Sequence, residues 1–189
     1  VEDGRVIANI GGKAGSTEGN TGAGIVAFNA DTGAVLWTAT NHEASYSSPV
    51  GATFGGRRRA VFFTREGLIG LDPADGGLVF QRRWRSRTAS SVNAATPLVV
   101  GDLVFVSATY ETGAAVLRVQ ESELIELWAS DEVLSNHYAT SVFYNGYLYG
   151  FHGRQEFNPS FRAVELTTSV VKWSVDRFHA GTITLAKVN

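Results

Sequence analysis

The side chains best suited to chemistry stand in four short polar clusters spread along the chain. The clusters are Ser45-Tyr46-Ser47, Asn93, Asn136-His137-Tyr138 and His179. A histidine beside a tyrosine can move a proton or donate hydrogen bonds near neutral pH, so His137 is the leading candidate. Loops also use Asn, Ser and His to tie their own backbones together. A structural role therefore remains open for each cluster.

Arginine supplies the remaining candidate groups. Arg154 lies in a short Gly-Arg-Gln segment, and four arginines between residues 82 and 87 surround Trp84. Such a mixture can bind anions or stack on a planar ligand. The alternative is a loop whose arginines stay in water while Trp84 packs, and this is the interpretation we favour for residues 82–87.

Several kinds of chemistry lack the residues they need. The chain has no cysteine, which excludes a disulfide scaffold and a thiolate metal site. Its four histidines show no tight metal-ligand spacing, and no Gly-x-Ser-x-Gly motif is present. The Gly-Gly-Lys-Ala segment in the loop 11–22 does not fit a phosphate-binding loop, because alanine follows the lysine and no helix is expected next.

Composition limits the class of protein and its partners. The chain has 189 residues, of which 44% are hydrophobic, enough for one domain with a sizeable core. A net charge of −2 gives no basic field for nucleic acid, and no apolar run is long enough to cross a membrane. The chain begins with Val-Glu-Asp-Gly, so we expect that a targeting peptide has been removed or that the chain is a piece of a longer protein.

A repeated hairpin must position these residues. Residues 24–37 read as two β-prone runs joined by Asn-Ala-Asp-Thr-Gly, and three similar hairpins follow. The closing aromatic residue falls at Trp37, Phe80, Trp128 and Trp173, in steps of 43, 48 and 45 residues. Eight residues earlier stands a polar side chain, at Asn29, Asp72, Gln120 and Glu165.

The turns of these hairpins are not all alike in sequence. Gly33 and Gly76 stand four residues before the aromatic in the first two copies, where the last two copies have Leu124 and Ser169. We therefore expect the last two turns to be built differently.

Each hairpin is preceded by a shorter strand–turn–strand unit. Such units fall at 49–64, 96–108 and 139–151, a strand is expected at 5–10, and 182–186 begins another unit. A period of 40–50 residues made only of short strands is typical of a four-stranded β-propeller blade. The sequence therefore predicts an all-β chain of about four antiparallel blades in one domain over residues 1–189, with the aromatics wedged between blades.

The hairpin pattern Ala-x-Asn/Asp-x-x-Thr-Gly-x-x-x-Trp resembles the tryptophan-docking repeat of the PQQ-binding-like β-propellers. The chain is most similar to bacterial PQQ-like repeat proteins of unassigned function, which have stretches like 46–49, 92–97 and 135–140. The superfamily includes quinoprotein alcohol dehydrogenases and the scaffold lipoprotein of the outer-membrane β-barrel assembly machinery. The resemblance implies a periplasmic or secreted protein and a ring of about eight blades, completed by a longer parent chain or by a second copy.

In a propeller the polar clusters would gather at one mouth of the central channel. We expect a ligand-binding face there, formed by Tyr46, Asn93, Asn136, His137, Tyr138, His179 and Arg154. We predict no catalytic residue, metal or cofactor. The hypothesis is a non-catalytic scaffold or binding module of the bacterial envelope that contacts a protein or small ligand. The alternatives are a fragment of a PQQ- and calcium-dependent quinoprotein dehydrogenase and a carbohydrate-active propeller that uses the Tyr/His/Arg face.

Overall fold

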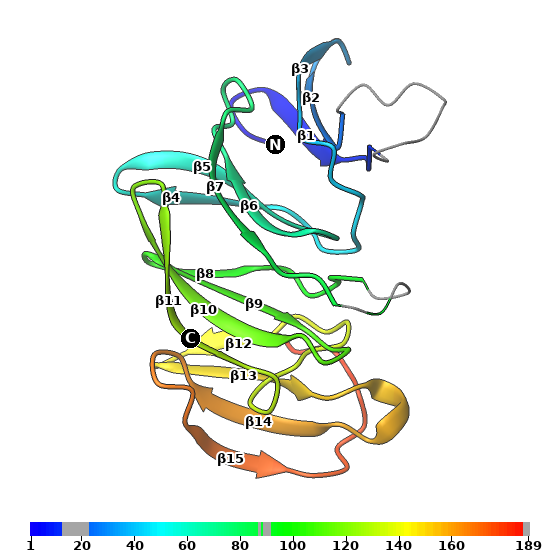
Figure 1. Ribbon diagram of the computed structural model, residues 1–189, viewed down its shortest axis with the longest axis vertical. Helices are drawn as coiled ribbons and strands as arrows, with labels where there is room; N and C mark the ends of the chain where they lie inside the picture. The colour runs from blue at the N-terminus through cyan, green and yellow to red at the C-terminus, as the bar shows by residue number, and fades with distance from the viewer. Residues whose placement is uncertain (13–22, 87, 89–91, 187–189) are drawn as a thin grey trace.

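Four antiparallel sheets follow one another along the chain and stack in sequence order (Figure 1). The computed structural model describes residues 1–12, 23–86, 88 and 92–186, so most of the Gly-rich loop 11–22 lies outside the described residues. Each sheet is a simple meander in which neighbouring strands are also neighbours in sequence. The sequence prediction of an all-β propeller-type fold is confirmed.

We call the four sheets blades 1 to 4. Blade 1 contains β1 (Arg5–Asn9), β2 (Ile25–Asn29) and β3 (Val35–Ala39). Blade 2 contains β4 (Val50–Phe54), β5 (Arg57–Thr64), β6 (Gly67–Leu71) and β7 (Leu78–Arg83). Blade 3 contains β8 (Leu98–Val100), β9 (Leu103–Ala108), β10 (Gly113–Gln120) and β11 (Glu123–Ser130). Blade 4 contains β12 (Val142–Tyr144), β13 (Tyr147–His152), β14 (Ser160–Glu165) and β15 (Val171–Val175).

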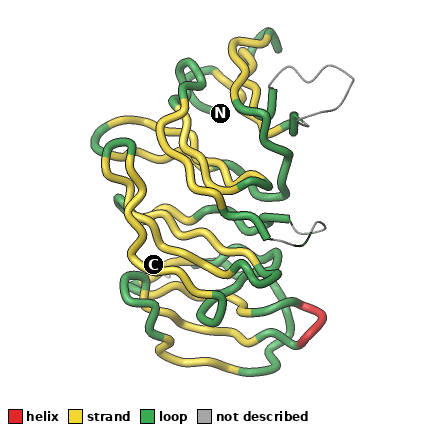
Figure 2. The backbone as a smooth tube through the Cα atoms, viewed as in Figure 1, coloured by secondary structure: helices red, strands yellow, loops and turns green. Residues whose placement is uncertain are grey.

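Two features differ from a set of four complete blades. Blade 1 has three strands, and Thr182–Ala186, which we expected to begin a strand, is irregular and lies outside any sheet. A strand needs a neighbour for its backbone groups, and blade 1 lies at the opposite end of the stack (Figure 1). The described residues hold a single helical turn, η1 (Gln155–Phe157), and no helix long and apolar enough to span a membrane (Figure 2).

The repeated aromatic has the same local environment in every blade. It pairs with a small or β-branched residue on the preceding strand: Ala27, Gly70, Val116 and Ala163. A register shift follows this pair in each blade, so the bulge is part of the repeat. Gly70 shows why the partner is small, since a Cβ there would lie 2.2 Å from the Phe80 ring.

The hairpin turns correct one prediction. Gly33 and Gly76 have φ values of 71° and 77°, in the left-handed region that glycine favours. Ser169 adopts the same conformation with φ of 64°, and its N–H donates to Glu165 just as that of Gly33 donates to Asn29. The fourth turn is therefore built like the first, because serine tolerates a geometry that glycine adopts without strain. The third turn does differ, since it is a tight connection between Gln120 and Glu123.

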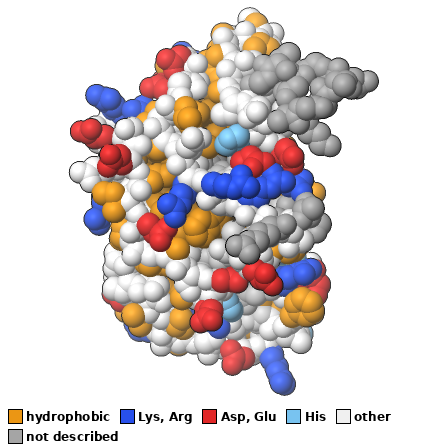
Figure 3. All heavy atoms as spheres, in the orientation of Figure 1, with side chains coloured by type: hydrophobic (Ala, Val, Ile, Leu, Met, Phe, Trp, Pro, Cys, Tyr) orange, Lys and Arg blue, Asp and Glu red, His pale blue; other side chains and the backbone are white. Residues whose placement is uncertain are grey.

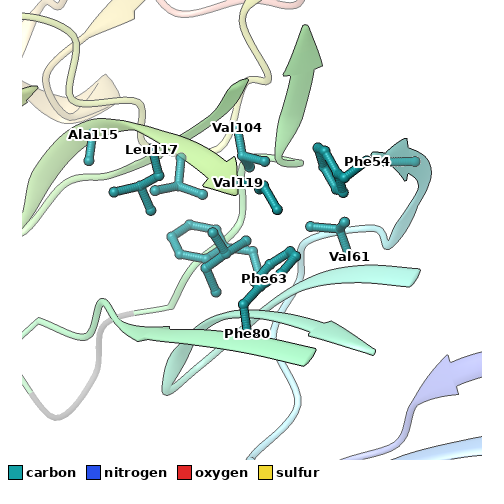
Figure 4. Packing of buried hydrophobic residues seen from close by; sticks show 11 residues of the cluster. Phe54, Val61, Phe63, Phe80, Val104, Ala115, Leu117 and Val119 are labelled. Atoms are coloured by element: carbon teal, nitrogen blue, oxygen red, sulfur yellow. The ribbon is translucent and has the colours of Figure 1, made fainter. Parts of the chain in front are cut away.

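Apolar side chains fill the three junctions between successive blades. The junction of blades 2 and 3 brings Phe54, Phe63 and Phe80 against Val104 and Leu117 (Figure 4). Equivalent clusters lie between blades 1 and 2 and between blades 3 and 4. Each blade thus buries its faces against its neighbours, as stacked repeats do.

Two of the closing tryptophans also make a hydrogen bond across a junction. The Trp37 indole N–H donates to the Pro73 carbonyl of the next blade at 3.2 Å, and Trp128 donates to Leu166 in the same way at 2.7 Å. Phe80 has no such donor but is only 3% exposed. Trp173 lies at the end of the stack and is 38% exposed, so it is not wedged between two blades as predicted.

Candidate binding face of the inter-blade loops

The meander topology places every candidate residue on loops at one end of the blades. In a four-stranded antiparallel meander, the connection between the second and third strands and the connection to the next blade leave the same end. The candidates lie in the loops 40–49, 84–97, 131–141 and 153–159 and after β15, which all belong to this set. We call this end the loop face; it lies on the right in Figures 1 and 2.

Asn93 is buried and holds two other loops in place. Its side-chain amide donates to the carbonyls of Thr64 and Trp84, both at 2.8 Å. Its own carbonyl accepts bonds from the N–H of Ser47 and the hydroxyl of Ser45. The residue is 3% exposed. Asn93 therefore connects the loop that carries Tyr46 to blades 2 and 3.

Asn136 has an equivalent role between blades 3 and 4. Its side-chain N–H group donates to the Phe151 carbonyl at 2.9 Å, and its side-chain oxygen accepts a bond from the Ser141 hydroxyl. Its backbone N–H donates to the hydroxyl of Ser107, which in turn donates to the Leu134 carbonyl. The residue is fully buried. These bonds use the whole side chain to fix the loop 131–141.

His137 is buried among aromatic rings. Its ring stacks on Tyr138 with 3.8 Å between centroids, and Tyr110 meets it edge-on at 5.4 Å. The N–H of Gln155 points at Nδ1 from 3.5 Å, so Nε2 carries the proton and donates it to the Tyr110 hydroxyl at 2.9 Å. Burial lowers the pKa of His137, against the opposite effect of Glu156. The histidine is thus held neutral, with both nitrogens engaged.

Arg154 extends this group toward the surface. Its guanidinium lies over the Tyr110 ring at 4.9 Å and over the Phe157 ring at 5.3 Å, and it pairs with Glu156 at 3.2 Å. The Phe157 side chain is 73% exposed. A cation between two rings is favourable where one ring still faces water. The result is a rigid aromatic platform on the loop face.

Tyr46 and His179 do not join this group. Tyr46 is 76% exposed on the loop between blades 1 and 2. His179 is exposed, although the residues that follow it, 180–182, form a hollow of about 290 Å³ together with His137 and Tyr138. The structure therefore brings His137, Tyr138 and Arg154 together, turns Asn93 and Asn136 inward, and leaves Tyr46 apart.

A larger hollow beside the platform contains residues that the sequence analysis did not select. It measures about 590 Å³ and lies between blades 3 and 4, where Tyr110, Asp131, His152 and Phe157 contribute to its wall. His152 accepts a bond from the Ser135 N–H through Nδ1 at 3.1 Å. Burial, aided by Arg162, lowers the pKa of His152 to about 4. Tyr110 and His152 stand where β9 and β13 end on the loop face, a position that the repeat could have marked.

The arginine-rich stretch forms ion pairs. Arg83 and Arg85 pair with Glu66, and Arg82 pairs with Glu126 across the junction to blade 3. The cluster of basic and acidic side chains is visible near the middle of the molecule in Figure 3. Trp84 packs against the core and donates to the Gly113 carbonyl at 3.2 Å. The described part of this stretch is therefore a charged surface with a buried tryptophan.

The described residues contain no group of three or more His, Asp or Glu side chains that could hold a metal ion. The buried docking tryptophans, the bulged hairpins and the meander blades define a β-propeller built from PQQ-like repeats. The chain belongs to the PQQ_2 family, described as outer membrane protein assembly factor BamB, whose model matches residues 1–177. No curated protein matches the chain significantly.

Solved structures share the fold. A europium-containing methanol dehydrogenase aligns with a TM-score of 0.51 and 17% identity over 80% of this chain. The quinohemoprotein alcohol dehydrogenase ADHIIG from Pseudomonas putida HK5 aligns with a TM-score of 0.51 and 16% identity over 71% of this chain. The alignments cover 39% and 21% of those two proteins, so the chain spans well under half of either relative.

Proposed function

We propose that the chain is a non-catalytic propeller module of the bacterial cell envelope that binds a protein partner through its loop face. One observation carries this proposal. The polar side chains there that could do chemistry are buried in framework hydrogen bonds, whereas aromatic side chains of the same loops face water. Asn93, Asn136 and His137 are each at most 5% exposed, but Tyr46 is 76% and Tyr138 44% exposed.

This division suits recognition better than proton transfer. A general acid or base must reach the atom it protonates, and His137 has both ring nitrogens occupied. Exposed tyrosines offer a large, stiff contact area that loses little conformational entropy on binding. The phenol hydroxyl adds a hydrogen bond at the edge of the contact. A protein surface is the class of ligand that such a face fits best.

The family supports both the location and the kind of partner. Its description names an outer membrane protein assembly factor, which works in the envelope and on other proteins. The dehydrogenase relatives share the fold at 16–17% identity and keep a second candidate open, a fragment of a PQQ-dependent enzyme. A small ligand or a polysaccharide on the Tyr/His/Arg face is the remaining alternative. The complete ring of about eight blades, supplied by a longer parent chain or by a second copy, belongs to the same proposal.

Site-directed photo-crosslinking in intact cells tests the partner. A photoreactive phenylalanine is placed at Tyr46 or Tyr138 on the loop face, and at Tyr144 as the matched control. Tyr144 is 57% exposed but lies at the opposite end of the blades, where β12 turns into β13. We expect positions 46 and 138 to capture the same envelope protein and position 144 to capture none. Equal capture from all three positions would contradict a binding role for the loop face.

A second measurement addresses the enzymatic alternatives. The protein is incubated with PQQ and Ca²⁺, and its absorbance spectrum and dye-linked alcohol oxidation are recorded. We expect the spectrum of free PQQ and no oxidation, and we expect no reducing ends to be released from acidic or neutral polysaccharides. A bound quinone that turns over alcohols would replace the proposal with the dehydrogenase alternative.

A further inference from the structure

The two ends of the blade stack expose the two halves of a contact that the interior junctions bury. At an interior junction, a tryptophan on the outer strand of one blade donates to a turn carbonyl of the next blade. Trp173 occupies the same repeat position in blade 4 and has no such carbonyl among the described residues. Its ring is 38% exposed, against 9% for Trp128.

Blade 1 carries the matching turn with nothing docked on it. Pro73 and Leu166, whose carbonyls accept the indole bonds, are both buried. Ala30 stands at the same place in the turn of blade 1 and is exposed. Gly76 lies under the Trp37 ring, 2.6 Å from where a Cβ would stand, whereas Gly33 has open space above it. Blade 1 thus offers a vacant docking turn of the kind that Trp173 lacks.

The faces of the end blades are complementary in the same way. Blade 4 presents an aromatic row on the side away from blade 3, in which Phe161 contacts both Phe151 and Trp173 at centroid distances of 5.2 and 5.4 Å. On blade 1, the cross-strand pairs Val6–Phe28 and Ala8–Val26 face away from blade 2. They match the pairs in blade 3 that pack on blade 2, namely Val104–Leu117 and Val106–Ala115.

The backbone shows the same complementarity. The second strand of blades 2, 3 and 4 has a partner on each side, but β1 pairs only with β2 among the described residues. Residues 182–186 follow β15 as the innermost strand β12 follows β11, and they have no strand partner. Their sequence, Thr-Ile-Thr-Leu-Ala, alternates polar and apolar residues as a half-buried strand does. They could supply the innermost strand that blade 1 lacks.

We propose that blade 4 of one copy docks on blade 1 of a second copy, with the Trp173 indole on the Ala30 carbonyl and residues 182–186 added to the free edge of β1. The contact is head-to-tail, so each copy still offers one free end after the first contact. A second, identical contact uses those ends, closes two copies into one eight-bladed ring and leaves no free sheet edge. This inference does not depend on what the loop face binds.

Sedimentation equilibrium of the 189-residue chain tests the assembly. We expect micromolar protein to have twice the monomer mass of 20.3 kDa. Trp173→Ala removes the docking ring, and Val6→Glu places a charge on the opposite half of the contact. Each should weaken the dimer by about thirtyfold or more, as expected for a central contact residue. Ile125→Ala is the matched control, because Ile125 is 42% exposed on an interior blade.

Mixing the two variants tests the direction of the contact. The Val6→Glu copy keeps an intact blade 4 and the Trp173→Ala copy keeps an intact blade 1, so the mixture should form a one-contact heterodimer more stable than either homodimer. Circular dichroism confirms that each variant is folded before mixing. A monomeric wild type overturns the proposal, as does a mass that keeps rising with concentration. A dimer that only one of the two variants weakens indicates a head-to-head contact and also overturns it.

Discussion

Trp128 and Trp173 occupy the same repeat position but differ in their surroundings. Trp128 is 9% exposed and bonded to Leu166, while Trp173 is 38% exposed and undocked. We predict that Trp128→Ala lowers the free energy of unfolding by about 3–5 kcal/mol, because it opens a cavity at a blade junction and leaves a buried carbonyl unpaired. Trp173→Ala, the control, should cost less than half as much in urea unfolding of the monomeric protein. A loss under about 1 kcal/mol for Trp128→Ala would contradict the docking role.

His152 should make stability depend on pH. The pKa of a histidine in the unfolded chain is 6.5, and that of His152 is lowered to about 4. Above pH 6.5 both states are neutral, so no stability is lost. Between pH 6.5 and 4 the unfolded chain takes up the proton first, and stability falls by about 1–3 kcal/mol, reduced from the full linkage value because the ring is partly hydrated. Below pH 4 this loss levels off.

The matched variant is His152→Asn, whose side-chain oxygen can still accept the Ser135 N–H. We expect urea unfolding at pH 7 and pH 4.5 to show a smaller loss for the variant than for the wild type. His42 and His137 also have lowered pKa values, but they are present in both proteins and their contributions cancel in the comparison. An equal pH dependence in both proteins would show that His152 is not the titrating group.

Residue types alone could not assign the polar candidates. The sequence marked Asn93 and Asn136 correctly as special positions in the repeat, but their partners are backbone carbonyls of Thr64, Trp84 and Phe151. Those carbonyls approach only after the blades have stacked, so no local pattern shows them. Tyr110 was missed for the same reason, since its contact with His137 joins two loops 27 residues apart.

At the scale of the hairpin, Gly33 and Gly76 share one backbone conformation but not one environment. Gly33→Ala places a Cβ in open space at φ of 71°, so it should cost about 1 kcal/mol from backbone strain alone. Gly76→Ala adds a clash with the Trp37 ring and should cost about 1–3 kcal/mol more. Urea unfolding of the two variants gives the difference. Equal costs would show that Trp37 does not press on this turn.

Ser169→Gly tests the same turn from the other side. Ser169 has φ of 64°, where a residue with a Cβ is strained by about 1–2 kcal/mol. Glycine removes that strain but makes the unfolded chain more flexible, so we expect a net stabilisation of about 0.5–1 kcal/mol. Thr168→Gly is the control, since Thr168 lies next in the turn and outside the left-handed set. A destabilised Ser169→Gly variant would show that the serine is not strained.

The elements were largely predictable because their signals are local. Alternating apolar residues and turn sequences predicted β9 at its observed bounds, Leu103–Ala108, and most other strands within a few residues. Thr182–Ala186 was predicted as the start of a strand and is irregular, because a strand also requires a neighbour that local sequence does not guarantee. The turn at Ser169 was misjudged because it keeps its geometry without the glycine that usually reveals it.

At the scale of the whole molecule, stability should be highest in the middle of the stack. Blades 2 and 3 are covered on both faces by apolar clusters, while blades 1 and 4 each have one such junction. In stacked repeats, the free energy of opening a unit depends on the contacts with its neighbours. An end blade can therefore open by breaking one junction, whereas opening an interior blade breaks two.

Native-state hydrogen exchange measures this gradient. In monomeric Trp173→Ala protein, we expect amides of β5, β9 and β10 to exchange only through global unfolding, and those of β2 and β14 to exchange through local openings that cost several kcal/mol less. Urea should lower the protection of the interior strands steeply and that of the end blades weakly, because local opening exposes less surface. Uniform protection in all four blades would mean that the stack opens only as a unit, and that one junction holds an end blade as firmly as two hold an interior one.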